Sequence, residues 1–206
     1  MKSNLNDILS KTTIGLVVFD LDGTLYEKKG LARRMFFAAL KDWKLMLAER
    51  KTRKLLRGEW YENEDRFYEI YFKTMSAYCN LSAEESQSWY FDCYLPLMVA
   101  TIQKYHMPVK WLAQLLKSLR AQGIKMVVLS DYEYASEKLN ALGIDNSQFD
   151  WVVSAPKLGG LKPAHQVLEK VLETMGYTPK QCLVIGDRED TDGQLAQSVG
   201  TAFYRV

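Results

Sequence analysis

Residues 14–25 read IGLVVFDLDGTL, an apolar run that leads directly into two carboxylates one residue apart. The run predicts a buried β-strand, and the period of two along an extended chain places Asp20 and Asp22 on the same side. Two acids at the edge of a core repel each other and lose hydration, so we expect a cation to neutralise them. The Gly-Thr pair that follows turns the backbone and exposes N–H groups, which indicates a site for a divalent cation and an anionic group.

The C-terminal half of the chain alternates between short apolar runs and amphipathic helical patterns. We expect strands at 14–19, 125–129, 151–153, 182–185 and 202–206, and helices at 108–122, 134–142, 164–175 and 193–199. This alternation is typical of an α/β fold, here a Rossmann-like parallel sheet with helices on both faces. In such folds the ligand crevice lies beyond the carboxyl ends of the strands. Polar residues follow three of the predicted strands: Asp20 and Asp22, Ser130 and Asp131, and Asp187.

Residues 30–105 show helical patterns and need no strand. We expect helices over 31–50 and 63–78, a third that opens with a capping box at Ser82 to Glu85, and a fourth from Pro96 to Tyr105. The first pattern spaces Phe36, Leu40, Trp43 and Leu47 by three and four residues. We therefore expect an all-helical cap over residues 30–105, inserted into a core formed by residues 1–29 and 106–206.

The composition is that of an ordinary globular protein, with 206 residues, 48% of them apolar, and a net charge of +2. This charge argues against an electrostatically driven nucleic-acid partner. No apolar run approaches the ~20 residues that span a bilayer, so we expect no membrane partner. The polar start at residues 1–7 lacks the apolar region of a secretory signal. The three cysteines form no Cys-x-x-Cys pair, which favours reduced thiols and a cytoplasmic location.

The predicted cap separates its charges along the sequence, with a basic stretch over residues 28–57 followed by an acidic one over 59–69. This pattern fits either a positive surface facing an anionic substrate or two neighbouring helices whose solvated faces pair, and the second interpretation is favoured. Arg33 and Arg34 are the best candidates for substrate specificity, because they lie nearest to the Asp20 loop. The aromatic segment 60–72 is interpreted as cap core rather than as an interface, and the oligomeric state is open. His106 and His165 lack a ligand-spaced partner and are interpreted as structural.

Four motifs together resemble those of the haloacid dehalogenase-like hydrolases. They are Asp20-Leu21-Asp22-Gly23-Thr24-Leu25, Ser130 after a strand, Lys162 in Gly160-Leu161-Lys162-Pro163, and Gly186-Asp187-Arg188-Glu189-Asp190-Thr191-Asp192. They occur in the family's order, and the match covers roughly residues 12–27 and 107–206. The helical insert is similar to the family's C1-type cap.

The resemblance implies a Mg²⁺-dependent phosphatase that acts on a small phosphorylated metabolite through an aspartyl-phosphate. Asp20 would be the nucleophile and a metal ligand, and Asp22 the general acid and base, with its main-chain carbonyl on the metal. Asp187 would complete the protein ligands and Asp192 would support them. Ser130, the N–H of Asp131, and Lys162 would bind the phosphate. Asp131 stands where the family commonly has Asn, and its side chain is expected to point away.

An Asp at position 22 fits enzymes that protonate an oxygen leaving group, since the family's dehalogenases lack an acid there. Two alternatives stay open. One is a phosphomutase of the β-phosphoglucomutase type, which shares every core residue. The other is a catalytically retired binding or regulatory domain, against which the complete set of charges argues. A sugar phosphate, a nucleotide and phosphoglycolate all fit as substrates.

Overall fold

The computed structural model describes residue 5 and residues 13–206. The polar start at residues 1–7, where we expect no secretory signal, lies outside the described residues except for Leu5. Five parallel strands form one sheet in the order β3-β2-β1-β4-β5. The strands are β1 (Leu16–Phe19), β2 (Lys125–Ser130), β3 (Trp151–Ser154), β4 (Cys182–Gly186) and β5 (Ala202–Arg205). Each lies within two residues of its predicted bounds, and the predicted α/β class is confirmed.

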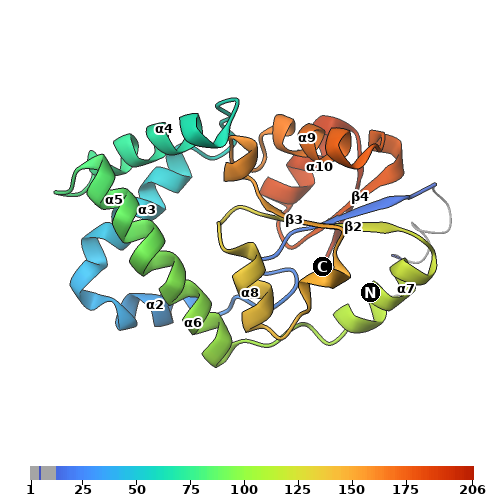
Figure 1. The fold of residues 1–206 in the computed structure, drawn as a ribbon, viewed down its shortest axis with the longest axis horizontal. Helices are drawn as coiled ribbons and strands as arrows, with labels where there is room; N and C mark the ends of the chain where they lie inside the picture. Colours follow the sequence, from blue (N-terminus) through green and yellow to red (C-terminus); the bar gives the residue numbers. More distant parts are fainter. Residues whose placement is uncertain (1–4, 6–12) are drawn as a thin grey trace.

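Helices cover both faces of the sheet (Figure 1). They are α7 (Leu112–Ala121), α8 (Ala135–Ala141), α9 (His165–Met175) and α10 (Gln194–Val199). Strand β1 shows how the pleat divides the core: Val17 and Phe19 belong to the cluster that contains α7 and α8, whereas Leu16 and Val18 pack in the cluster of α9 and α10. Because both faces are buried, β1 reads as a continuous apolar run rather than an alternating one.

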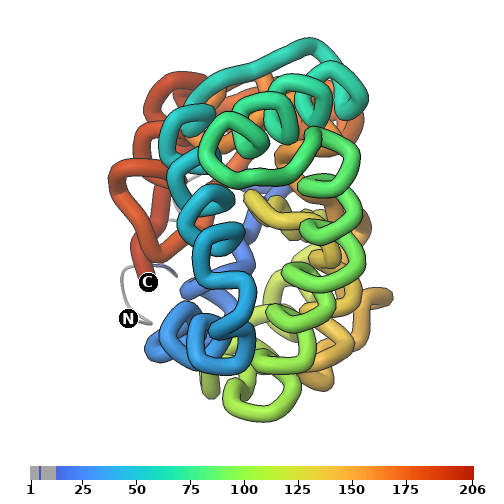
Figure 2. The backbone as a smooth tube through the Cα atoms, turned by 90° about the vertical axis from the view of Figure 1, so that its left-hand side faces the viewer, coloured from blue at the N-terminus to red at the C-terminus, as the bar shows by residue number. Residues whose placement is uncertain are grey.

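Between β1 and α7 the chain forms the helical insert, defined here as residues 31–105, in which the structure shows no β-strand. Its helices are α2 (Leu31–Ala38), α3 (Trp43–Leu55), α4 (Glu64–Ser76), α5 (Ala83–Trp89) and α6 (Leu95–Tyr105). Figure 2 looks at the molecule from the side of the insert, and α3 and α6 lie on opposite sides of this view. Among the helices of the described residues, none is both long and apolar enough to cross a lipid bilayer.

The N-terminal signals of the insert helices act as the sequence predicts. The Asn63 side chain accepts a hydrogen bond from the N–H of Arg66 at 2.9 Å, which caps α4. Ser82 and Glu85 form the expected capping box at the start of α5. The third and fourth predicted helices are joined by a π-helical turn over Tyr90–Tyr94. The aromatic residues Phe67, Tyr68, Tyr71 and Phe72 are buried, which agrees with their interpretation as insert core.

The single helix predicted over residues 31–50 is wrong. The chain leaves the helical conformation at Ala39, makes a 3-10 turn over Leu40–Asp42, and begins α3 at Trp43. The Asp42 carboxylate accepts a hydrogen bond from the Trp89 indole at 3.2 Å, so a tertiary contact holds this break. The apolar residues of the predicted stripe are exposed: Phe36, Leu40, Trp43 and Leu47.

Candidate active site

Three adjacent strands, β2, β1 and β4, end at the same edge of the sheet and place acidic residues there. Asp20 follows β1, and its N–H continues the ladder to the carbonyl of Ile185 at 2.9 Å. Asp187 follows β4, and Asp192 lies on the turn that leads into α10. One carboxylate oxygen from each of Asp20, Asp187 and Asp192 lies within 4.8 Å of the others. This grouping supplies hard oxygen donors at a spacing compatible with one bound cation.

Lys162 neutralises two of these acids. Its ammonium lies 2.7 Å from the Asp20 carboxylate and 2.7 Å from that of Asp192, and the residue is 3% exposed. Burial alone would lower the pKa of Lys162, but Asp192 and Asp20 more than offset it and hold this pKa well above its ordinary value. Lys162 is therefore a fixed positive charge beside the Asp20 carboxylate.

The helical insert holds the loop that carries Lys162. The N–H of Tyr61 donates to the carbonyl of Gly159 at 2.7 Å, and the N–H of Leu161 donates to that of Glu59 at 3.1 Å. Gly159 has a φ of 91°, and a Cβ there would lie 2.8 Å from the backbone N of Asn63. A side chain at position 159 would thus break both the local conformation and this close approach.

Asp192 and Asp131 flank the same lysine. Burial raises the pKa of Asp192 to about 6, with the Lys162 ammonium opposing this rise and Asp20 adding to it. The Asp131 side chain was expected to point away from the site. Its Oδ1 accepts a hydrogen bond from the main-chain N–H of Lys162 at 3.0 Å, and the residue still lines the cavity.

Asp22 is held by three side chains on the side of the sheet edge toward α8. Its carboxylate accepts hydrogen bonds from Tyr26 at 2.6 Å, from Lys138 at 2.6 Å and from Ser130 at 3.2 Å. Burial would raise the pKa of Asp22, but the Lys138 ammonium and these hydrogen bonds together keep it below its ordinary value. The Asp22 carboxylate is therefore ionised in this arrangement.

Two features of this arrangement differ from the sequence expectations. The Ser130 hydroxyl, expected to face a phosphate, is fully buried, donates to Asp22 and accepts from the N–H of Tyr132 at 3.1 Å. Lys138, whose side chain is 0% exposed, was not foreseen as a site residue. A signal for it exists in the sequence, because Lys138 falls on the apolar stripe that Ala135, Leu139 and Leu142 form in the helical pattern.

Lys28 contacts the other acid-bearing loop. Its ammonium lies 2.8 Å from Oδ2 of Asp187 and donates to the main-chain carbonyl of Asp22 at 2.9 Å. Gly23, with a φ of 111°, leaves room for this approach, since a Cβ there would lie 2.5 Å from Oδ2 of Asp187. A positive charge thus already sits between two oxygens of the site.

A cavity of about 460 Å³ opens over these residues and is walled by both parts of the chain. From the insert come Leu31, Ala32, Met35, Arg50, Tyr94 and Met98. Three lining cations have anionic partners: Lys28 pairs with Asp187, Lys162 with Asp20 and Asp192, and Arg188 with Asp190. Within the described part of the chain, no hydrogen bond or ion pair holds the guanidinium of Arg50. Its guanidinium is available to a bound ligand.

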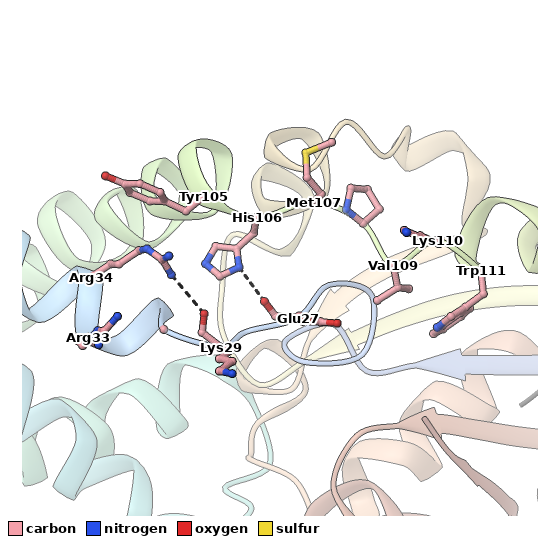
Figure 3. A pocket seen from close by; sticks show the side chains of 12 residues that line it. Glu27, Lys29, Arg33, Arg34, Tyr105, His106, Met107, Val109, Lys110 and Trp111 are labelled. Atoms are coloured by element: carbon pink, nitrogen blue, oxygen red, sulfur yellow. Dashed lines mark hydrogen bonds between the residues drawn. The ribbon is translucent and has the colours of Figure 1, made fainter.

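The structure does not bring Arg33 and Arg34 into this cavity. They line a separate pocket of about 730 Å³. Its other walls come from the two segments that connect core and insert, residues 27–30 and 105–111. Figure 3 shows Arg34 directed at the carbonyl of Lys29, to which it donates at 3.3 Å. His106 lies beside them, with Nδ1 2.8 Å from the carbonyl of Glu27, which agrees with a structural role. Arg33 and Arg34 were chosen because they are near the Asp20 loop in the sequence. The arginine of the insert that lines the cavity over Asp20 is instead Arg50.

A buried polar cluster ties α3 to the loop after β2. Arg53 bonds to Glu49 at 2.9 Å and donates to the main-chain carbonyl of Asp131 at 2.8 Å. Tyr71 and Tyr94 also donate to Glu49, at 3.0 and 3.2 Å. The Arg53 guanidinium lies 3.7 Å from the ring centroid of Tyr132.

A second arginine of the insert, Arg57, also contacts the core. It pairs with Asp190 at 2.7 Å. Two residues of the basic stretch, Arg53 and Arg57, thus contact the core rather than the acidic stretch.

Comparisons with known proteins agree with the motifs. Residues 14–200 match the family model described as haloacid dehalogenase-like hydrolase. Glyceraldehyde 3-phosphate phosphatase of Methanothermobacter thermautotrophicus is 30% identical over 92% of this chain and 84% of its own. Phosphoglycolate phosphatase of Aquifex aeolicus is 26% identical over 90% of this chain and 81% of its own.

Solved structures share the fold. L-2-haloacid dehalogenase from Xanthobacter autotrophicus superposes with a TM-score of 0.61 at 22% identity, covering 94% of this chain and 77% of its own. A phosphatase from Thermococcus onnurineus gives a TM-score of 0.61 at 20% identity, over 94% of this chain and 86% of its own.

Proposed function

The chain belongs to the haloacid dehalogenase-like hydrolases and hydrolyses phosphoric monoesters, and we propose that the cavity over Asp20 is where it cleaves a small phosphorylated metabolite. The observation that carries this proposal is the meeting of Asp20, Lys162, Asp187 and Asp192 at one edge of the sheet. Phosphoryl transfer depends on positioning and on neutralising the negative charge of the transferring oxygens. A carboxylate nucleophile beside a buried lysine meets both needs.

Asp20 is the proposed nucleophile. One carboxylate oxygen accepts from the Thr24 hydroxyl at 2.7 Å and the other bonds to Lys162, so the side chain is held in one orientation. Attack of an Asp20 oxygen on phosphorus forms an aspartyl-phosphate and releases the alcohol of the substrate. Lys162 reduces the repulsion between the two anions as they meet.

Asp22 is the proposed acid and base. As the ionised base it accepts a proton from the water that cleaves the aspartyl-phosphate, which fits its lowered pKa. To act as the acid, its carboxyl group must carry a proton and turn from Lys138 toward the leaving oxygen. Ser130, Tyr26 and Lys138 define the resting position from which it turns.

The donor set fits Mg²⁺, which prefers oxygen ligands in octahedral geometry. Asp20, the Asp22 carbonyl and Asp187 would hold the ion, and Asp192 would support them. The contacts of the Lys28 ammonium with two of these oxygens support a cation at this position. When bound, Mg²⁺ neutralises charge on the transferring phosphoryl oxygens.

The substrate class follows from the walls of the cavity. We extend the proposal to a cap role for residues 30–105 over a core of residues 1–29 and 106–206, so that the insert limits the size of what enters. The relatives' names, glyceraldehyde 3-phosphate phosphatase and phosphoglycolate phosphatase, point to short phosphorylated metabolites. Arg50, the unpaired cation of the insert wall, would bind the oxygen-rich end distant from the phosphate. Free thiols, including the exposed Cys93, support a cytoplasmic location.

The test is phosphate release with and without Mg²⁺ from p-nitrophenyl phosphate and a panel of small phosphomonoesters. We expect metal-dependent release by the wild type and a loss of at least about 10³-fold in Asp20→Asn, which keeps the shape but removes the nucleophile. Isomerisation of a phosphomonoester without phosphate release would favour the phosphomutase alternative. Equal rates of phosphate release by the wild type and Asp20→Asn would remove the nucleophile assignment.

A further inference from the structure

The Lys28 ammonium occupies a defined position in the site. It lies 2.8 Å from Oδ2 of Asp187 and 2.9 Å from the main-chain oxygen of Asp22. These two oxygens come from different strand ends, β4 and β1, and are two of the three ligands assigned above to Mg²⁺. The ammonium therefore lies between the same oxygens that a bound ion would share.

An ammonium and Mg²⁺ cannot hold these oxygens together. Mg²⁺ binds oxygen at about 2.1 Å, so an ammonium hydrogen-bonded to the same two oxygens would lie close to the ion. Two positive charges this close to each other would repel strongly. One cation must leave when the other enters.

Lys28 is the cation of the site that can leave. Its side chain is 42% exposed, whereas that of Lys162 is 3% exposed and bonds to two buried carboxylates. Exposed ion pairs contribute little to stability, and a long lysine side chain regains rotamer freedom when it is released into water. Gly23 presents no side chain that would block this movement.

We propose that Lys28 fills the metal position in the metal-free protein and that Mg²⁺ binding is an exchange of this ammonium for the ion. Lys28 thereby lowers the apparent affinity for Mg²⁺ and keeps the carboxylate of Asp187 neutralised until the metal arrives. This inference rests on the proposed metal site.

The first test measures Mg²⁺ binding by isothermal titration calorimetry in the wild type, Lys28→Met and Lys29→Met. Methionine keeps the length of the side chain and removes its charge. We expect Lys28→Met to bind Mg²⁺ about five- to twentyfold more tightly, because no charge-assisted contacts need to break. Lys29 is the matched control, since it lines the other pocket, and its variant should change affinity less than about twofold through long-range charge alone.

Equal Mg²⁺ affinities in the wild type and Lys28→Met would overturn the proposed exchange of Lys28 for the ion. An equal gain in Mg²⁺ affinity in Lys28→Met and Lys29→Met would also overturn it. Either result would leave the metal site in place. Absence of Mg²⁺ binding in all three proteins would overturn the metal assignment on which the inference rests.

The second test uses the wild-type protein. Brief acetylation followed by peptide mass mapping reports how free each lysine is, and saturating Mg²⁺ should raise the modification of Lys28 severalfold relative to Lys29. Unchanged or reduced labelling of Lys28 would contradict the exchange, even if the Lys28→Met variant proved unstable.

Discussion

Lys138 lies fully buried with its ammonium 2.6 Å from the carboxylate of Asp22, the two residues being 116 positions apart in the chain. Asp22 follows β1 and Lys138 comes from α8, so the pair joins the first strand to a helix on the face of the sheet. A buried lysine requires such a partner, because an unpaired charge in the core is costly. The pair therefore fixes both the fold of α8 against the sheet and the resting orientation of Asp22.

Lys138→Met should destabilise the protein by about 3 kcal/mol, because it leaves the Asp22 carboxylate without its cation. Urea unfolding at pH 7 measures this loss. The double variant Asp22→Asn/Lys138→Met should regain at least half of it, since neither charge is then present. A Lys138→Met midpoint equal to that of the wild type would contradict the pairing.

The difference in stability between the wild type and Lys138→Met should decrease at low pH. Because the pKa of folded Asp22 lies below its ordinary value, the pair stabilises the protein above the unfolded-state pKa of about 3.9. The stabilisation is lost as pH falls through the lower, folded-state pKa. The gap between wild type and Lys138→Met should therefore shrink in unfolding curves recorded below about pH 4.

Arg50→Gln should lower kcat/KM for 2-phosphoglycolate by about tenfold or more, because a charge-assisted contact to the carboxylate end is lost. Hydrolysis of p-nitrophenyl phosphate, which has no second anion, should change by less than about threefold. Steady-state kinetics on both substrates separate the two effects. Arg33→Gln and Arg34→Gln are matched controls, because both residues line the other pocket and should leave both rates unchanged. Equal losses on the two substrates would exclude Arg50 as the group that binds the distant end.

Arg53→Met should cost about 3 kcal/mol or more in chemical denaturation, because Glu49 is 2% exposed and would lose its cationic partner. The control is Arg66→Met: Arg66 pairs with Glu69 on an exposed helix surface, and its loss should stay within about 0.5 kcal/mol. Similar losses in the two variants would show that the buried cluster does not stabilise the contact between insert and core.

The three cysteines should differ in their reaction with a disulfide reagent at pH 8. Burial raises the pKa of the Cys182 thiol to about 12, whereas Cys93 is exposed. Cys93 should react first, and Cys182 only when the protein unfolds, because the thiolate is the reactive form. Absorbance kinetics with and without urea check this, and Cys93→Ser should lose the fast phase. Rapid labelling of Cys182 in the native protein would contradict the packing of β4.

The sheet and its helices could be predicted because they depend on local pattern. Apolar runs, capping residues and glycine stops lie within a few positions of the elements they define, as with Ser82 and Glu85 at the start of α5. The strand ends that carry Asp20 and Asp187 follow from the same patterns, since parallel strands end at one edge.

The remaining features depend on contacts between distant parts of the chain. The break at Ala39 coincides with a hydrogen bond from Trp89 to Asp42, which no local pattern encodes. Arg33 and Arg34 lie on α2 and Arg50 lies on α3, so this break separates the helices that carry them. Lys138 is the exception: a lysine on an apolar helical stripe signals a buried partner, although the sequence does not identify that partner as Asp22.

The most direct measurement is the location of the phosphoryl group during turnover. The wild type is mixed with Mg²⁺ and a phosphomonoester, quenched in acid, and digested for peptide mass mapping. The account predicts one added phosphoryl group on the peptide that contains Asp20, and none in Asp20→Asn treated in the same way. Phosphate release by the wild type with the added group on a different residue would contradict the account.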